Sequence, residues 1–250
     1  MTVTLCGFPI ENVSMSEAVD RVADLAASNE PRHVTFMNAH YVNVAAREAA
    51  YDGALRGADL MFADGSGMKV AGRLHGVPLV DNVNGTDMFP LLALELERRG
   101  ASIFLLGGRP GIAEGVTTYL SEHAPDLEVR GFAHGYRSEE EWDPIVSEIA
   151  RLRPDVLLVA MGAPLQDVWI QRWLDRLGVP VVMAVGGLFD FYSGRIPRAP
   201  RLLRAVGMEW VFRLLQEPSR MWRRYLIGNF VFLFRALRET LEPVSPEHGT

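Results

Sequence analysis

Five apolar segments of this 250-residue sequence end in residue types suited to binding a phosphorylated ligand. Glycines at such positions offer bare backbone N–H groups, and the N-terminus of a following helix adds a favourable dipole, so an anion such as a diphosphate is the natural ligand. The candidates, with the arginine that follows the last segment, are Asn38, Asp64, Gly65, Gly107, Gly108, Gly162, Pro164, Gln166, Gly186, Gly187, Asp190 and Arg195.

The elements that position these residues follow from the hydrophobic pattern. After a short opening strand and a helix capped by Ser14 or Ser16, apolar runs alternate with longer helical patterns. Apolar strands buried on both faces and separated by helices indicate an α/β fold, a Rossmann-like open parallel sheet flanked by helices. Ligands bind such sheets beyond the carboxyl ends of the strands, where the candidates fall. A glycine at one such turn is often needed only for the turn conformation, but five such loops together favour a nucleotide-binding site. The runs are 33–38, 58–63, 102–107, 127–133, 155–162 and 180–186, and the helical patterns are 39–56, 86–99, 110–123, 138–151 and 165–177.

Several other chemistries lack their motifs. The segment GGRPG does not have the spacing of a dinucleotide fingerprint, and the only lysine, Lys69, lies outside any phosphate-binding loop. Ser66 is not in a nucleophile elbow. We find no Asp-x-Asp pair and no Cys/His cluster, so we expect no metal site and no cofactor. In such a metal-free site, backbone N–H groups and arginine side chains would stabilise the negative charge of a leaving group.

Composition narrows the class of protein further. Apolar residues make up 48% of the chain and charged residues 22%, which allows a large buried core. The net charge of -6 argues against a nucleic-acid partner. The single cysteine, Cys6, suits a reducing cytoplasm. We expect neither a signal peptide at the N-terminus nor a membrane-spanning helix.

The C-terminal part of the chain has the opposite charge. Between Arg195 and Arg238 there are ten arginines and two acidic residues, a net charge of about +8. We therefore expect a catalytic domain over 1–194, a basic, aromatic-rich helical appendage over 195–241, and a disordered tail over 242–250. On a continuous helix Arg213, Arg220 and Arg224 share one face, and Arg223 lies off it.

These residues also form extended motifs. They include ADGSGMKVAGRLHG, NGTDMF, IFLLGGRPGIAE, PDVLLVAMGAPLQDVWI and GGLFDFYSGRIPRAPRLLRAVGMEWVFRLLQEPSRMWRRY. From about residue 3 to 230 the chain resembles the WecG/TagA/CpsF glycosyltransferase family. The resemblance implies an inverting transferase that moves N-acetylmannosamine, glucose or a related hexose from a UDP-sugar donor to a polyprenyl-diphosphate-linked sugar. Cell-wall polymers and exopolysaccharides are the implied products.

The resemblance also implies roles for individual residues. Asp64 is the general base that takes a proton from the acceptor hydroxyl, and partial burial should raise its pKa. The alternative is that Asp64 only caps the helix that starts at Ser66. Gln166, Asp190 and Asn38 would contact the nucleotide-sugar, or else only close their loops by hydrogen bonds. The family commonly has threonine where Phe36 stands, and PKQE where this chain has PLQD.

For the appendage two roles are compatible with the residue pattern. Arg213, Arg220, Arg223 and Arg224 would grip a diphosphate, or they would dock with the interleaved aromatic residues on an anionic membrane. The simpler alternative is a solvated basic face on an ordinary packing helix. The resemblance supports a peripheral enzyme on the inner face of the cell membrane, and the exposed aromatic residues allow a homo-oligomer. A soluble Rossmann-type oxidoreductase or methyltransferase and a non-catalytic nucleotide-binding membrane adaptor are the competing hypotheses.

Overall fold

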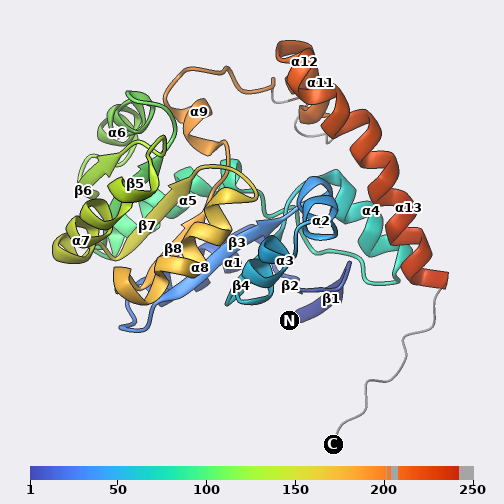
Figure 1. Cartoon of the computed structure of the whole chain (residues 1–250), viewed down its shortest axis with the longest axis horizontal. Coiled ribbons are helices and arrows are strands. Elements are labelled where there is room, and N and C mark those ends of the chain that lie inside the picture. Colours follow the sequence, from blue (N-terminus) through green and yellow to red (C-terminus); the bar gives the residue numbers. More distant parts are fainter. Residues whose placement is uncertain (201, 204–207, 242–250) are drawn as a thin grey trace, which may run out of the picture.

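The computed structural model describes residues 1–200, 202–203 and 208–241. Its centre is an eight-stranded sheet with the order β1-β2-β4-β3-β8-β7-β5-β6 (Figure 1). Strands β1 and β2 form an antiparallel hairpin, and every other pairing is parallel, which confirms the predicted fold class. The strands are β1 (Thr2–Leu5), β2 (Phe8–Glu11), β3 (Arg32–Met37), β4 (Leu60–Ala63), β5 (Ser102–Gly107), β6 (Glu128–Ala133), β7 (Val156–Ala160) and β8 (Val181–Ala184).

Helices cover both faces of this sheet. The apolar residues of α1, α5 and α6 form one buried cluster with the strands, and those of α7 and α8 form another on the opposite face. Helix α1 begins with a capping box at Ser14, one of the two predicted caps. The helices up to β8 are α1 (Met15–Ala26), α2 (Ala39–Ala45), α3 (Ala49–Arg56), α4 (Ser66–Leu74), α5 (Gly85–Arg98), α6 (Ile112–His123), the 3₁₀ turn η1 (Glu139–Glu141), α7 (Trp142–Leu152) and α8 (Leu165–Leu177).

Two sequence predictions of local structure are wrong. The opening segment forms a two-stranded hairpin, β1 and β2, where we expected one strand. The helical pattern over 39–56 is two helices, because α2 ends at Ala45 and α3 starts at Ala49. The apolar period continues through this break, so periodicity alone did not reveal it.

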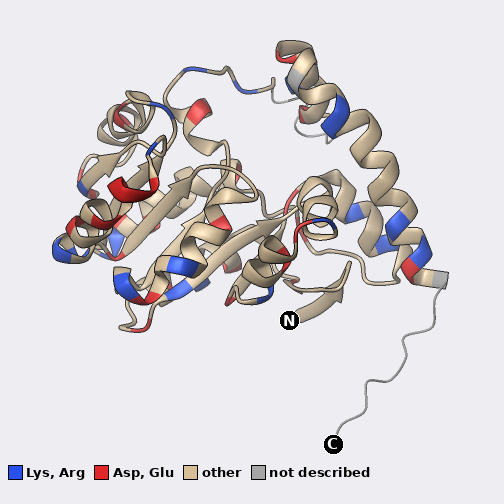
Figure 2. Ribbon diagram, viewed as in Figure 1, with Lys and Arg blue, Asp and Glu red and all other residues tan. Residues whose placement is uncertain are grey.

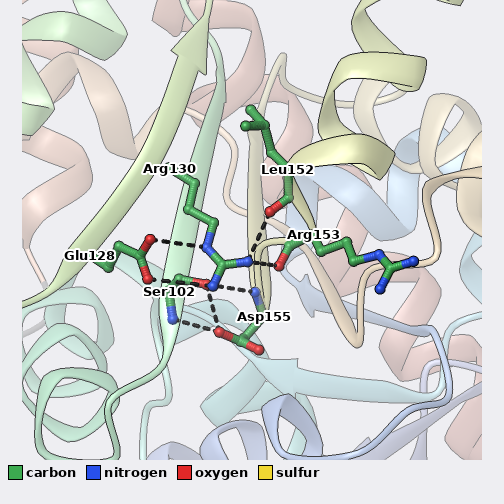
Figure 3. A network of polar contacts seen from close by, with 6 residues as sticks. All are labelled: Ser102, Glu128, Arg130, Leu152, Arg153 and Asp155. Atoms are coloured by element: carbon green, nitrogen blue, oxygen red, sulfur yellow. Dashed lines mark hydrogen bonds and ion pairs between the residues drawn. The ribbon is translucent and has the colours of Figure 1, made fainter.

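At the amino ends of the strands, polar contacts tie β5, β6 and β7 together (Figure 3). The carboxylate of Asp155 accepts hydrogen bonds from the backbone N–H and the hydroxyl of Ser102, at 2.7 and 2.6 Å. The guanidinium of Arg130 donates to the carbonyl oxygens of Leu152, at 2.8 Å, and Arg153. These contacts lie at the end of the sheet opposite to the candidate site.

Beyond β8 the regular elements of the described residues are helices. Helix α9 (Leu188–Tyr192) is followed by α11 (Glu209–Gln216), α12 (Pro218–Trp222), the π-helical turn η2 (Arg223–Ile227) and α13 (Gly228–Leu241). Helix α13 runs along α2 and α4 at one side of the molecule (Figure 1). Phe232 and Ala236 of α13 are buried there, and Nδ2 of Asn43 donates to the carbonyl oxygen of Gly228 at 2.7 Å. The predicted tail, 242–250, lies outside the described residues.

Candidate active site

A cavity of about 1090 Å³ lies beyond the carboxyl ends of the parallel strands. Its volume lies just above the range of about 300 to 1,000 Å³ that is typical of small-molecule sites. Loops that follow β3, β4, β5, β6, β7 and β8 all contribute to its wall, which places the predicted loops at one rim of the sheet. The predicted residues that line it are Asn38, Asp64, Gly108, Gly162, Gly186, Gly187, Asp190, Arg195, Arg213 and Arg224.

Asp64 and Asn38 follow neighbouring strands and touch each other. The backbone N–H of Asp64 donates to the carbonyl oxygen of Met37 at 2.8 Å, which extends the β3–β4 pairing by one residue. Nδ2 of Asn38 donates to Oδ2 of Asp64 at 3.4 Å, and Oδ1 of Asn38 caps α2 by accepting the N–H of Tyr41 at 3.0 Å. Asn38 therefore begins a helix and also holds a carboxylate.

The alternative role for Asp64, as a helix cap, does not match the structure. The N-cap of α4 is Gly65, at φ +93°, and α4 has no side-chain cap. The N–H of Gly65 donates instead to Oδ1 of Asn82 at 2.6 Å. The side chain of Asp64 is thus free to face the cavity.

The environment of Asp64 raises its pKa to about 6. Burial is the main cause, because a desolvated carboxyl group favours its neutral form. The hydrogen bond from Asn38 and the charges of Arg224 and Arg213 act in the opposite direction, and the charge of Glu209 raises the pKa further. A carboxyl group with a pKa near 6 is ionised at neutral pH and is a stronger base than an ordinary aspartate.

His40, which the sequence analysis did not select, lies on the same wall of the cavity. Burial, together with the charges of Arg224 and Arg47, lowers the pKa of His40 to about 4. The imidazole is therefore neutral at physiological pH and can donate or accept a hydrogen bond beside Asp64. Its position two residues after Asn38, inside an apolar helical pattern, gave no sequence cue to this role.

Gln166 joins two of the glycine loops. Its Oε1 accepts the backbone N–H of Gly162, at 3.1 Å, and that of Gly186, at 2.9 Å. The side chain is fully buried and does not line the cavity. Nε2 of Gln166 has no hydrogen-bond partner within the described ranges. Gln166 therefore fixes the loops after β7 and β8 relative to each other.

Other predicted residues also lie off the cavity wall. Gly107, at φ +140°, is where β5 passes so close to β7 that a Cβ would lie 2.3 Å from the carbonyl oxygen of Ala160. Pro164 precedes α8 without lining the cavity. The guanidinium of Arg223 lies over the ring of Trp222, 5.3 Å from its centroid, outside the cavity. The side chain of Arg220 lies outside the described part of the chain.

Arginines supply positive charge to the cavity. Arg213 packs over the ring of Phe191, 4.8 Å from its centroid, and a Cβ at Gly187 would lie 3.4 Å from its Nη2. Arg224 lies on the same wall as Asp64. Nη1 of Arg195 pairs with Oδ1 of Asp190 at 2.6 Å, so that these two predicted residues form one unit. Backbone N–H groups and guanidinium groups together suit a diphosphate.

A second cavity, of about 330 Å³, adjoins the first. Asn38, His40, Asp64, Arg213 and Arg224 line both, and Gly65 lines only the smaller one. The smaller cavity lies between α4 and the appendage, with residues of α11, η2 and α13 on one side. Asp64 therefore stands on the wall that the two cavities share.

Sequence reasoning missed further residues of the large cavity. Thr86 is the second residue of α5, and Arg109, Tyr136 and Arg137 lie on the loops that follow β5 and β6. The guanidinium of Arg109 lies 5.6 Å from the ring centroid of Tyr136. Only Arg109, in the segment GGRPG, had a recognisable cue, because it follows a glycine pair at a strand end.

Neither a metal-binding cluster nor a membrane-spanning helix is present in the described residues. Within the described ranges, no three or more His, Cys, Asp and Glu side chains gather in a way that would hold a metal ion. In the same part of the chain, no helix has the length and the apolar character needed to cross a membrane.

The fold and the site together define a class: an α/β enzyme with an arginine-lined cavity at the carboxyl rim of its sheet and a carboxylate of raised pKa. Residues 3–245 match the model of the glycosyl transferase WecG/TagA/CpsF family. The chain belongs to this family and is a glycosyltransferase.

The chain is also similar to curated bacterial transferases. Three of them share the name N-acetylglucosaminyldiphosphoundecaprenol N-acetyl-beta-D-mannosaminyltransferase. The protein from Bacillus spizizenii is 30% identical over 176 residues, which cover 70% of this chain and 67% of the relative. The Bacillus subtilis protein is 27% identical over 226 residues, with coverages of 90% and 87%. The protein from Staphylococcus aureus strain MW2 is 27% identical over 234 residues, with coverages of 92% and 91%.

Proposed function

We propose that this glycosyltransferase moves N-acetylmannosamine from a UDP-sugar to undecaprenyl-diphosphate-linked N-acetylglucosamine, with inversion at the anomeric carbon, in cell-wall polymer biosynthesis. The names of the relatives support the sugar and the acceptor. The observation that carries the chemistry is a half-buried Asp64, with a pKa of about 6, on the wall of a cavity that is also lined by arginine and glycine residues.

In the proposed reaction a hydroxyl oxygen of the acceptor attacks the anomeric carbon of the donor. Its proton passes to the carboxylate of Asp64, and the bond from the anomeric carbon to the diphosphate oxygen breaks, so that UDP leaves with the electron pair. Arg213, Arg224 and the N–H group of Gly187 stabilise the charge on the leaving diphosphate. Nothing in this scheme requires a metal ion.

The two parts of the chain divide these tasks. Residues 1–194 supply Asp64 and the glycine loops, and 195–241 supply Arg213 and Arg224, which close the site. The loop after α9 is tied back to α5, since Nη2 of Arg198 pairs with Oδ1 of Asp87 at 2.7 Å. Because Arg213 and Arg224 line the larger cavity, removal of the appendage would open that cavity.

The appendage also has the surface of a peripheral membrane anchor. Phe232 of α13 is buried against the protein, yet Phe230 and Phe234 are 77% and 69% exposed. Leu226 and Ile227 are about half exposed on the preceding turn. Basic positions of α4 and α13 lie beside each other (Figure 2). An exposed apolar helix flanked by basic residues is typical of attachment to an anionic lipid surface.

The function is tested by transfer with a panel of UDP-sugars and a short-chain polyprenyl-diphosphate-N-acetylglucosamine acceptor, with and without a metal chelator. We expect acceptor-dependent UDP release and a disaccharide product from UDP-N-acetylmannosamine, unchanged by the chelator. Product from another UDP-sugar alone would overturn the proposed donor, and loss of activity with the chelator would overturn metal independence.

Membrane attachment is tested by flotation of the full chain with phosphatidylglycerol vesicles. Phe230→Glu combined with Phe234→Glu should abolish flotation. Phe132→Glu, at an exposed position on the edge strand β6, is the matched control and should float like the wild type. Equal flotation of the double variant and the wild type would contradict the proposed anchor.

A further inference from the structure

The position of Asp64 between two cavities raises the question of what the smaller one holds. The larger cavity has the glycine loops and most of the strand ends, as a nucleotide-sugar requires. The smaller cavity has a different wall and a third of the volume. A base that takes a proton from one substrate during attack on another must face both substrates. The wall shared by the two cavities meets this condition.

One side of the smaller cavity is aromatic. Trp210, Tyr225 and Phe232 line it, and the rings of Trp210 and Tyr225 are 5.9 Å apart between centroids. None of these three side chains lines the larger cavity. Trp210 and Tyr225 are only partly buried, so their faces remain available to a ligand. Such rings offer large rigid surfaces for the C–H face of a sugar ring.

The side of the smaller cavity formed by α4 and the segment before α5 carries uncharged polar side chains together with the carboxylate of Asp87. Oδ1 of Asn82 is used by the N–H of Gly65, which fixes the orientation of the amide. Nδ2 of Asn82 and the hydroxyl of Ser66 on this side, and the side-chain amide of Asn229 across the cavity on α13, have no hydrogen-bond partner among residues 1–200, 202–203 and 208–241. An oriented amide donor, a hydroxyl and a second amide match the hydroxyl and acetamido groups of an amino sugar.

We propose that the smaller cavity is the subsite for the terminal sugar of the acceptor, with the ring stacked on Trp210 and its polar edge on Asn82 and Ser66. This inference rests on the proposed function, since it presumes a sugar acceptor. The attacking hydroxyl then meets the anomeric carbon at Asp64, where the cavities join. The lipid chain of the acceptor extends out of the smaller cavity past Leu233. This residue lines the cavity on α13, beside the exposed Phe230 and Phe234.

The proposal is tested by substitutions at Trp210 in the full chain, with a water-dispersible short-chain acceptor and no vesicles. Trp210→Leu removes the aromatic face and should weaken acceptor binding to the UDP-loaded enzyme, and raise the acceptor KM, by roughly tenfold. Trp210→Phe keeps a ring and should recover most of the loss. Trp222→Leu, in the same appendage but outside both cavities, is the matched control.

The Kd for UDP and the KM for the donor distinguish a lost subsite from a misfolded site. We expect both to change less than about twofold in Trp210→Leu, because Trp210 does not line the larger cavity. An unchanged acceptor Kd, or a donor KM that rises as much as the acceptor KM, would overturn the subsite. Acceptor binding is measured without turnover, so the subsite is tested even where the proposed transfer fails.

Discussion

Asn38 donates a hydrogen bond from Nδ2 to Oδ2 of Asp64, at 3.4 Å, with its Oδ1 committed to the N-terminus of α2. The helix cap fixes which end of the amide faces Asp64, because only the NH₂ group is left for the carboxylate. The hydrogen bond stabilises the ionised form and limits the rise in pKa that burial causes. Asn38 thus lowers the pKa of Asp64 but is not itself the general base.

This relationship predicts the effect of Asn38→Asp. The new side chain keeps an oxygen for the cap but replaces the donor with a second carboxyl group next to Asp64. Two neighbouring carboxyl groups resist double ionisation, so the acidic limb of the rate profile should move to higher pH by about one unit or more. The measurement is kcat/KM against pH for this variant and the wild type. A profile identical to that of the wild type would show that Asn38 does not influence the base.

For the wild type, the pKa of Asp64 sets the pH dependence of transfer. Asp64 must be ionised to accept a proton, so kcat/KM should fall as the pH drops below about 6 and level off above it. Binding of UDP, measured over the same range, controls for effects on donor affinity. If kcat/KM instead falls only near pH 3.8, the ordinary aspartate pKa, the raised pKa of Asp64 would be contradicted.

The same pKa makes Asp64 a cost to stability. The folded-state pKa of about 6 lies above the ordinary value of 3.8, so stability is lost as the pH rises from 3.8 to 6 and the desolvated carboxylate ionises. Asp64→Asn should therefore raise the free energy of unfolding by up to about 3 kcal/mol at pH 7.5 and by little at pH 4.

Urea unfolding at these two pH values measures this gain. Asp20→Asn, at an exposed carboxylate on α1, is the control and should change stability little at either pH. A gain from Asp64→Asn that is the same at pH 4 and pH 7.5 would contradict an ionisation origin.

Gln166 provides a prediction about the glycine loops. Gln166→Met keeps the side-chain length but leaves the buried N–H groups of Gly162 and Gly186 without their acceptor. We expect a loss of about 2 to 4 kcal/mol in the free energy of unfolding and weaker UDP binding. The exposed Gln171→Met on the same helix is the control. UDP affinity that stays at the wild-type level would show that the loops keep their geometry without Gln166.

The two arginines of the shared wall should act on the diphosphate. Arg213→Gln and Arg224→Gln should each weaken UDP binding by about tenfold or more, since hydrogen bonds to charged groups contribute about 1.5 to 3 kcal/mol. Uridine, which lacks phosphate, should bind the variants and the wild type alike. Arg151→Gln, at an exposed position on α7, is the control. Equal losses for UDP and uridine would indicate a collapsed site instead of a lost charge contact.

The sequence predicted the sheet well, because buried parallel strands are continuous apolar runs whose ends are marked by glycine and polar residues. Helix α8, over 165–177, matches its predicted range. Ligands bind open parallel sheets beyond the carboxyl ends of the strands, and this rule alone predicted that Asn38, Asp64 and the glycines lie at one rim. The break between α2 and α3 lay in an apolar pattern that continues through it, so it had no sequence cue.

The site was harder to predict because it depends on contacts between distant segments. Gln166 carries a recognisable motif, but only the structure shows its side chain facing the N–H groups of Gly162 and Gly186. The spacing of a continuous helix placed Arg223 on a different face from Arg213 and Arg224. The structure separates them in the same way, although the helix is interrupted at Glu217. The smaller cavity forms only where α13 packs against α4, and no local pattern encodes that contact.

The most direct test of the central claim compares the wild type with Asp64→Asn in a single-turnover transfer from UDP-N-acetylmannosamine to the short-chain acceptor at pH 7.5. UDP affinity is measured on the same samples. The account predicts that the variant transfers about 10²- to 10⁴-fold more slowly and binds UDP within about twofold of the wild type. Transfer at the wild-type rate by Asp64→Asn would contradict the assignment of Asp64 as the base.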